Sequence, residues 1–212
     1  MRPEDVAAGL TALSASRLLE ETDFELASVT GLQLTGESLM GKHFAACRIA
    51  RTVLSDGNLR KTTFDDVEFE DCDLSSVRLD GASLSEVTFR RCKLLGVDWS
   101  TASQSLIGQP LVFEECQLDF GVFQNVKLRG STFRDCSARE ADFVGADIGE
   151  SSFPGTNLER ARFGGTRLVD ADLEGARGYE LDPRENDVRG LRVGLPEGAA
   201  LLRVFGIVVD GG

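Results

Sequence analysis

The spacing of apolar side chains at every fifth residue is the feature that most constrains how this chain can fold. Every fifth residue from Phe24 to Trp99 is apolar, and the rhythm resumes from Phe113 to Leu173. A period of five matches neither the α-helical turn nor the two-residue alternation of a strand. We therefore expect an all-β solenoid: a square coil with one apolar side chain inside each of four sides, whose coils stack through backbone hydrogen bonds.

A second restricted position lies two residues before each apolar one. It holds small residues, such as Thr62, Val67 and Ala82, so we expect it to point inward as well. All five cysteines occupy it, namely Cys47, Cys72, Cys92, Cys116 and Cys136. This placement predicts buried small hydrophobes rather than reactive thiols. An odd number of cysteines also favours a reducing compartment over a disulfide framework.

Coils of twenty residues predict which side chains stack, and the break in the rhythm tests that prediction. Trp99 and Phe113 are fourteen residues apart, which implies either four inserted residues or one deleted. An insertion stacks Phe113 on Phe89 and aligns four cysteines in one column, whereas a deletion would place phenylalanine on a column of leucines. We therefore expect a small bulging loop within residues 100–112.

The stretch TFDDVEFEDCDL, residues 63–74, holds six acidic side chains in twelve residues. Stacking predicts that bases from the next coil neutralise much of this charge: Arg90 above Glu70, Arg91 above Asp71 and Lys93 above Asp73. Exposed ion pairs of this kind contribute only about 0–1 kcal/mol each. Asp65 and Asp66 have no such partner, because Ser85 and Glu86 lie above them.

The two ends of the chain depart from the repeat. Residues 1–21 are expected to form an N-terminal helical segment, with an amphipathic helix over 3–21 that either caps the first coil or docks loosely. Residues 22–177 are expected to form the solenoid. Residues 178–212 are expected to form a C-terminal cap, with a short helix starting at Pro196 and a strand-like GIVV after it. The open ends of a solenoid need such caps.

Composition excludes several classes of function. The net charge of −12 argues against direct binding to nucleic acid or to anionic membranes. No apolar stretch approaches the roughly 18 residues of a membrane span. The N-terminus lacks the features of a signal peptide, so a cytoplasmic location is expected.

The sequence carries no pattern typical of catalysis, a metal or a cofactor. Zinc-type CxxC and HExxH spacings are absent, as are the phosphate-binding GxxxxGK[ST] and GxGxxG motifs. The single histidine, His43, falls in an outward position and is expected to be a surface residue. We therefore expect no enzyme activity and no cofactor.

Segments such as ADFVGADIGE, TNLERARFGG and ADLEGA resemble the loose A(D/N)LxG consensus of the pentapeptide-repeat family. The resemblance covers roughly residues 22–177. It implies a right-handed quadrilateral β-helix, in which each coil contacts only its neighbours.

The segments DPRENDVRGLRVGLPEGAALLRVFGIVV and LLGVDWSTA resemble one group within that family, the topoisomerase-protecting proteins Qnr, MfpA, McbG and AlbG. In that group the tail joins two rods end to end. The resemblance thus implies a homodimer whose contact comprises Leu201, Leu202, Phe205, Ile207 and Val208. The N-terminal helix and the single short loop differ from the Qnr pattern.

The resemblance, together with the slender acidic exterior, points to a DNA mimic that binds DNA gyrase or a related type II topoisomerase. Such a protein would protect the enzyme from a poisoning antibiotic, as resistance or as self-immunity. The partner-binding surface is expected to include Asp65, Asp66, Asp80, Glu86 and Asp98. The alternatives are a scaffold or adaptor for another protein and, less in keeping with a five-residue repeat, a β-helical acyltransferase.

Overall fold

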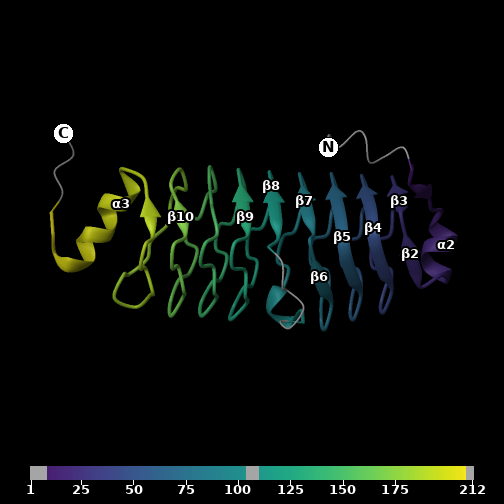
Figure 1. Cartoon of the computed structure of the whole chain (residues 1–212), viewed down its shortest axis with the longest axis horizontal. Coiled ribbons are helices and arrows are strands. Elements are labelled where there is room, and N and C mark those ends of the chain that lie inside the picture. Colours follow the sequence, from purple (N-terminus) through teal and green to yellow (C-terminus); the bar gives the residue numbers. More distant parts are fainter. Residues whose placement is uncertain (1–8, 104–109, 209–212) are drawn as a thin grey trace.

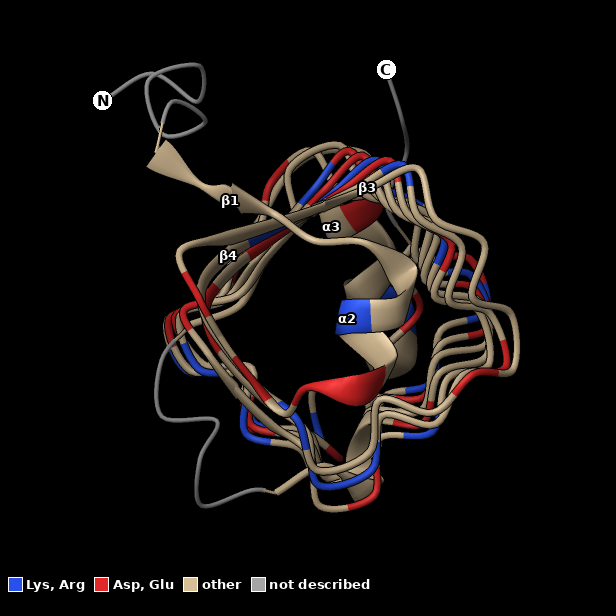
Figure 2. Ribbon diagram, turned by 90° about the vertical axis from the view of Figure 1, so that its right-hand side faces the viewer, with Lys and Arg blue, Asp and Glu red and all other residues tan. Residues whose placement is uncertain are grey.

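The computed structural model describes residues 9–103 and 110–208 and shows a rod of stacked parallel coils (Figure 1). Seen along its axis, each coil has four sides, and the helix α2 (Ala15–Glu20) lies across the N-terminal opening (Figure 2). The chain is therefore the right-handed quadrilateral β-helix expected from its five-residue period.

All paired strands are parallel, as successive turns of a solenoid require. The main sheet runs β1-β3-β4-β5-β7-β8-β9, with β2 paired to β4 and β6 paired to β5, and β10 pairs with β11 in a second sheet. The strands are β1 (Thr11–Ala12), β2 (Asp23–Glu25), β3 (Ala27–Thr30), β4 (His43–Ala50), β5 (Thr63–Glu70), β6 (Ser83–Ser85), β7 (Thr88–Arg90), β8 (Val112–Glu114), β9 (Thr132–Arg134), β10 (Asp172–Leu173) and β11 (Arg192–Val193). Isolated bridges such as Val53 with Asp73 continue the stacking between them.

We name the four sides by their buried central residues. Side A carries Phe24, Phe44 and Phe64; side B carries Ile49, Phe69 and Phe89; side C carries Leu54, Leu74 and Leu94; side D carries Leu59, Leu79 and Trp99. Residues twenty apart occupy the same place on successive coils, as the partners Phe44 with Phe64 and Ile49 with Phe69 show.

The aromatic stacks confirm the register predicted from the sequence. On side B, Phe69, Phe89 and Phe113 stack with centroid distances of 5.1 and 5.2 Å, and Phe113 stacks on Phe133 at 4.9 Å. On side D, Trp99 stacks on Phe123 at 5.6 Å. Offset stacking adds to the burial energy of each ring. The core is therefore a continuous file of aromatic and aliphatic side chains along the rod.

Small polar side chains in the second inward position complete the hydrogen bonds of the core. Thr62 Oγ1 donates to the Leu39 carbonyl at 2.8 Å, and Thr156 Oγ1 donates to the Phe133 carbonyl at 2.7 Å. The Cys72 thiol makes the same contact with the Ile49 carbonyl at 3.3 Å. A buried carbonyl without a partner is costly, so this position favours hydroxyls and thiols as well as alanine and valine.

Most corners are turned by one residue in the left-handed region of backbone space. Glycine fills it at positions such as Gly36 and Gly96, but aspartate, arginine and other residues with φ near +50° fill many others, Asp66 and Arg91 among them. The backbone N–H at the corner is satisfied from the next coil, as in Asp71 N–H to the Arg90 carbonyl at 3.0 Å. These bonds help offset the cost of the left-handed conformation.

The four-residue insertion lies between Ser103 and Val112, within the range predicted for it. Ser103 N–H bonds to the Ala82 carbonyl in the usual register, whereas Val112 pairs with Thr88. The helix η2 (Trp99–Thr101) precedes the insertion. Residues 104–109, which lie within the predicted range of the loop, are outside the described residues.

The N-terminal segment differs from the continuous helix predicted over 3–21. Residues 1–8 lie outside the described residues, Thr11–Ala12 form β1 against Ala27–Ser28, and the helix spans only Ala15–Glu20. The long helix was wrong because the exposed edge of the first coil offers backbone partners to residues 11 and 12. The segment does cap the rod, since Leu13 and Leu18 are buried in its core.

The C-terminal coil extends beyond residue 177, where the repeat pattern fades. Asp187 bridges to Arg167, and β11 pairs with β10. After it come α3 (Glu197–Ala200) and the 3-10 helix η3 (Leu201–Phe205), which confirms a short helix following Pro196. The expected strand over GIVV is absent at Ile207 and Val208, and Val209 lies outside the described residues.

Candidate interaction surfaces

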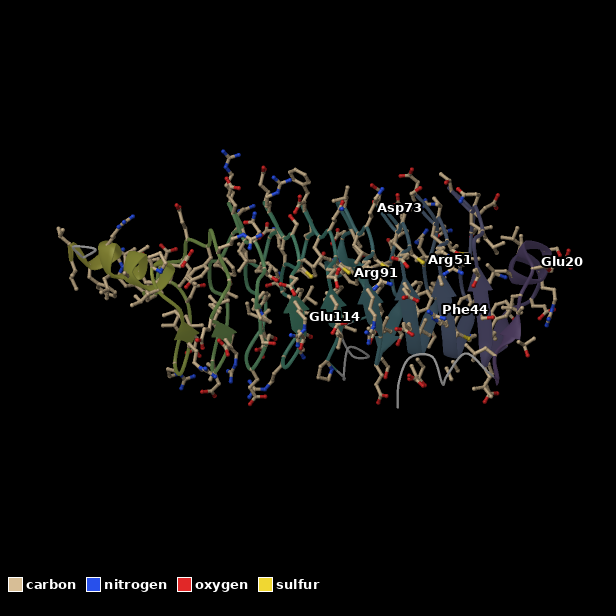
Figure 3. The ribbon with its side chains drawn as sticks, turned by 90° about the horizontal axis from the view of Figure 1, so that it is seen from above. Glu20, Phe44, Arg51, Asp73, Arg91 and Glu114 are labelled. Atoms are coloured by element: carbon tan, nitrogen blue, oxygen red, sulfur yellow. The ribbon has the colours of Figure 1, made fainter. Side chains whose placement is uncertain are left out.

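Side B carries a ladder of ion pairs that crosses several coils and neutralises its charge. Glu68 lies 3.0 Å from Arg90 and 3.8 Å from Arg48, and Arg90 lies 3.2 Å from Glu114. At the next corner, Arg91 lies 2.7 Å from Asp71. Arg91 and Glu114 both lie along the middle of the rod (Figure 3). Acid and base thus alternate up this side.

Glu70 does not pair with Arg90, the partner that stacking predicted. Glu70 is in register with Arg90, but its carboxylate pairs with Arg48 and Arg91 on the neighbouring coils. Partial burial raises the pKa of Glu70, but hydrogen bonds from the two guanidinium groups outweigh burial and lower the pKa overall. Long side chains reach diagonally, so stacking identifies the neighbouring coil but not always the partner.

Sides C and D are compensated in the same way. On side C, Asp73 faces Lys93 at 3.9 Å and Asp119 faces Arg139 at 2.9 Å. Asp119 and Asp142 are buried despite their charge, and each accepts from an arginine of the next coil. On side D, Arg162 lies 2.9 Å from Asp142. Compensation is partial on side C, where Asp56 and Glu159 make no ion pair among the described residues.

The N-terminal half of side A carries the largest group of unpaired acids among the described residues. In the first four coils its outward residues include five acids and no lysine or arginine, the acids being Asp23, Glu25, Asp65, Asp66 and Glu86. None of the five makes an ion pair within residues 9–103 and 110–208. Farther along, this side holds Asp147, Glu150 and Asp170 against Lys127, Arg129 and Arg167. The N-terminal half of this face is thus acidic without compensation among the described residues.

The five acids predicted as a partner-binding surface fall into two groups. Asp65, Asp66 and Glu86 lie together at the corner between sides A and B, which we call corner AB. Asp80 and Asp98 lie on side D. Asp80 pairs with Arg60 at 3.6 Å, and Asp98 accepts the Ser100 N–H at 3.0 Å to cap η2. Only the first group presents free carboxylates.

The predicted dimer contact also divides. Leu202, Phe205, Ile207 and Val208 are exposed at the C-terminal end of the rod, and Val208 is 84% exposed. Leu201 instead packs, partly buried, against the core of its own chain. Leu195, which the sequence pattern did not single out, is also 84% exposed at this end. An apolar end of this kind is typical of a protein–protein contact.

Sequence reasoning missed Lys42, which occupies an inward position normally given to a small residue. Its side chain is buried, donates to the Leu19 carbonyl at 3.0 Å and to the Glu21 carbonyl, and lies over the Phe24 ring. At the end of the rod an inward side chain can reach the cap, so Lys42 fastens the C-terminal end of α2 to the first coils.

The described residues show little that could support chemistry. They contain no group of three or more His, Cys, Asp or Glu side chains that could hold a metal ion. The five cysteines are free and buried. Hydrogen bonding with the Cys116 thiol, together with burial, raises the pKa of Cys92 to about 12. Such thiols stay protonated and unreactive near neutral pH.

No helix within the described ranges is long and apolar enough to cross a membrane. His43 is exposed on β4, as its outward position in the repeat predicted. The features that distinguish the surface are therefore the acidic half of side A and the apolar C-terminal end.

Comparison with known families gives two matches. A model described as "Pentapeptide repeat region" matches residues 42–107, and one described as "Pentapeptide repeats (8 copies)" matches residues 116–153 and 141–177. No curated protein matches the chain.

Several solved structures share the fold. Two trypsin-treated variants of QnrB1, a plasmid-mediated fluoroquinolone resistance protein, match with TM-scores of 0.69 and 0.71 at 20% and 19% identity. Each match covers 94% of this chain and 95% of QnrB1. HetL, involved in heterocyst differentiation regulation in the cyanobacterium Nostoc sp. strain PCC 7120, matches with a TM-score of 0.52 at 20% identity. That match covers 81% of this chain and 84% of HetL.

Proposed function

This chain belongs to the pentapeptide-repeat proteins, and from that premise we propose that it acts as a DNA mimic in the cytoplasm. In this proposal it binds DNA gyrase or a related type II topoisomerase and protects the enzyme from a poisoning antibiotic. The observation that carries the proposal is the uncompensated acid on one face of a slender rod. Such a face complements the basic surface on which a topoisomerase holds duplex DNA.

The spacing of the carboxylates in the acidic half of side A can be compared with that of the phosphates in DNA. Asp66 and Glu86 stand on successive coils, about 4.8 Å apart, with Asp65 beside them. Five unpaired acids over four coils give one charge per about 4 Å of axis. Duplex DNA carries one per about 1.7 Å, so this face offers a field of the same sign but weaker. Unlike DNA, the rod has no phosphodiester to cleave, so an enzyme that binds it has nothing to cut.

The apolar C-terminal end supports the second part of the proposal, a homodimer. Phe205 is 54% exposed and Ile207 is 48% exposed. Burying such side chains against a second copy would stabilise the dimer by about 25 cal/mol for each Å² removed from water. End-to-end pairing would give a rod of twice the length with one acidic half near each end.

A supercoiling assay with and without a fluoroquinolone tests the function. We expect the protein to inhibit gyrase alone at micromolar concentration and to restore its activity in the presence of the drug. The double variant Asp65→Lys, Asp66→Lys should lose both effects. The matched control Glu115→Lys, Asp135→Lys reverses two exposed carboxylates at the corner between sides B and C, and it should keep them.

The alternative is a scaffold that binds a different protein. It is favoured by the match to HetL, whose described role is unrelated to drug resistance and whose identity to this chain equals that of QnrB1. A protein that neither inhibits gyrase nor relieves the poison would leave this alternative standing.

A further inference from the structure

A groove of about 480 Å³ runs along corner AB near the N-terminal end of the rod. Its floor follows the corner residues of four successive coils, namely Leu26, Ala46, Asp66 and Glu86, and Leu10 closes one end. Because these residues are stacked, the groove runs parallel to the rod axis. Its length suits an extended peptide rather than a compact ligand.

The chemistry of the groove changes along its length, beginning with an apolar end. Leu10, Leu26 and Ala46 line the part over the first two coils. Leu26 is 54% exposed and adopts φ of +49°. An exposed leucine in the left-handed region is unfavourable twice over, by conformation and by contact with water. An apolar side chain from a partner would relieve the second cost.

The other end of the groove is acidic. Asp66 and Glu86 lie on the third and fourth coils, and neither makes an ion pair among the described residues. The arginines in the wall on side B do not neutralise them. Arg48 pairs with Glu68 and Glu70, and Arg90 pairs with Glu68 and Glu114. The groove therefore presents a free negative end.

We propose that this groove binds an extended segment of a partner protein in which an apolar residue is followed, three or four residues later, by lysine or arginine. The two ends of the groove are two to three coils apart, about 10–14 Å, and an extended chain rises about 3.3 Å per residue. The apolar side chain packs on Leu10 and Leu26, and the cation faces Asp66 and Glu86. The acidic end disfavours nucleic acid and anionic lipid as occupants. This inference goes beyond the proposed function, because it specifies a peptide-sized site for any partner with that pattern.

The test is fluorescence anisotropy with two labelled peptides and the full chain at low salt. One peptide reads Leu-Ser-Ser-Arg, and the other carries glutamate in place of arginine. We expect the arginine peptide to bind at least tenfold more tightly. Asp66→Asn with Glu86→Gln should weaken it at least fivefold, and Leu26→Gly, which suits the positive φ, should also weaken it.

The control Glu115→Gln, Asp135→Asn removes the same charge from another corner and should leave peptide binding unchanged. Equal affinity for the two peptides, equal loss in the two double variants, or no binding at millimolar peptide would overturn the proposal. Peptide binding that appears only after residues 1–8 are deleted would also overturn the proposal. The same holds for binding that appears only at concentrations where the chain self-associates. A failed peptide assay with intact gyrase inhibition would reject the groove and leave the proposed function standing.

Discussion

Phe89 and Phe113 stack with their ring centroids 5.2 Å apart and their planes 6° apart, although they are four residues farther apart in the chain than Phe69 and Phe89, which stack on the preceding coils. The four additional residues leave the stacking of the interior side chains unchanged on both sides of Phe113. Packing of the core, rather than even spacing along the chain, therefore sets the register.

Phe113→Ala should test how much this stack stabilises the rod. Phe113 is fully buried between Phe89 and Phe133, and truncating such a ring costs about 3–5 kcal/mol because a cavity remains. Urea unfolding measures the loss. Phe120→Ala is the matched control, since Phe120 is 56% exposed and its truncation should change stability by about 0.5 kcal/mol or less. Similar losses in both variants would contradict the packing described here.

Lys42→Met should loosen the N-terminal cap. The substitution keeps the apolar stem but removes the ammonium that donates to the Leu19 and Glu21 carbonyls, and hydrogen bonds to charged groups contribute about 1.5–3 kcal/mol. Hydrogen exchange should become faster over residues 11–25 and stay unchanged over coils farther along. Lys61→Met, at an exposed corner, should leave exchange unaltered. Unchanged protection from exchange in the Lys42 variant would show that these hydrogen bonds do not hold the cap in place.

Acid should weaken the rod partly through Glu70 and Asp71. A hydrogen bond from Arg91 lowers the pKa of Asp71 below its ordinary 3.8, and the pKa of Glu70 is lowered below 4.5 despite partial burial. Since these groups bind protons more readily when unfolded, their stabilisation is present above pH 4.5 and is lost as pH falls through the lowered values.

Arg91→Gln should therefore flatten the dependence of unfolding free energy on pH in the acid range. Urea unfolding at several pH values from neutral pH down through the acid range measures this dependence. Arg78→Gln removes an exposed arginine for which no ion pair is found among the described residues, and it should keep the original slope. Identical slopes in the two variants would show that Arg91 does not set these pKa values.

The C-terminal end should control self-association. Phe205→Asp with Val208→Asp places two charges on the exposed apolar end, and we expect sedimentation to show a monomer where the unaltered chain is a dimer. Met40→Asp with Phe120→Asp alters two exposed apolar residues on the body of the rod and should leave the dimer intact. A monomeric unaltered chain, or a dimer that survives the first change, would refute the end-to-end contact.

The sequence predicts the body of the rod well because one rule applies at every coil. The apolar residue at each fifth position and the small residue two places before it are buried from Phe24 onward with few exceptions, such as the partly buried Phe163. The acids left unpaired by stacking, Asp65 and Asp66, make no ion pair within the part of the chain that the structure describes. Local spacing determines these features, so no knowledge of distant contacts is needed.

Features that depend on the ends of the rod could not be predicted in the same way. Thr11 and Ala12 form a strand because the edge of β3 is open, which the pattern of residues 3–21 does not reveal. Lys42 reads as an exception to the small-residue rule until the cap beneath it is known. The groove at corner AB is formed by Leu10 together with residues from four coils. The sequence does not show that Leu10 lies beside them, so the groove could not be predicted.

Competition for gyrase between labelled duplex DNA and this protein tests the central claim most directly. If the acidic half of side A replaces DNA on the enzyme, adding the protein should displace the duplex completely. The concentration needed should rise with salt, because screening weakens the attraction. A ternary complex of enzyme, duplex and protein, or displacement that Asp65→Lys with Asp66→Lys leaves unaltered, would contradict the account.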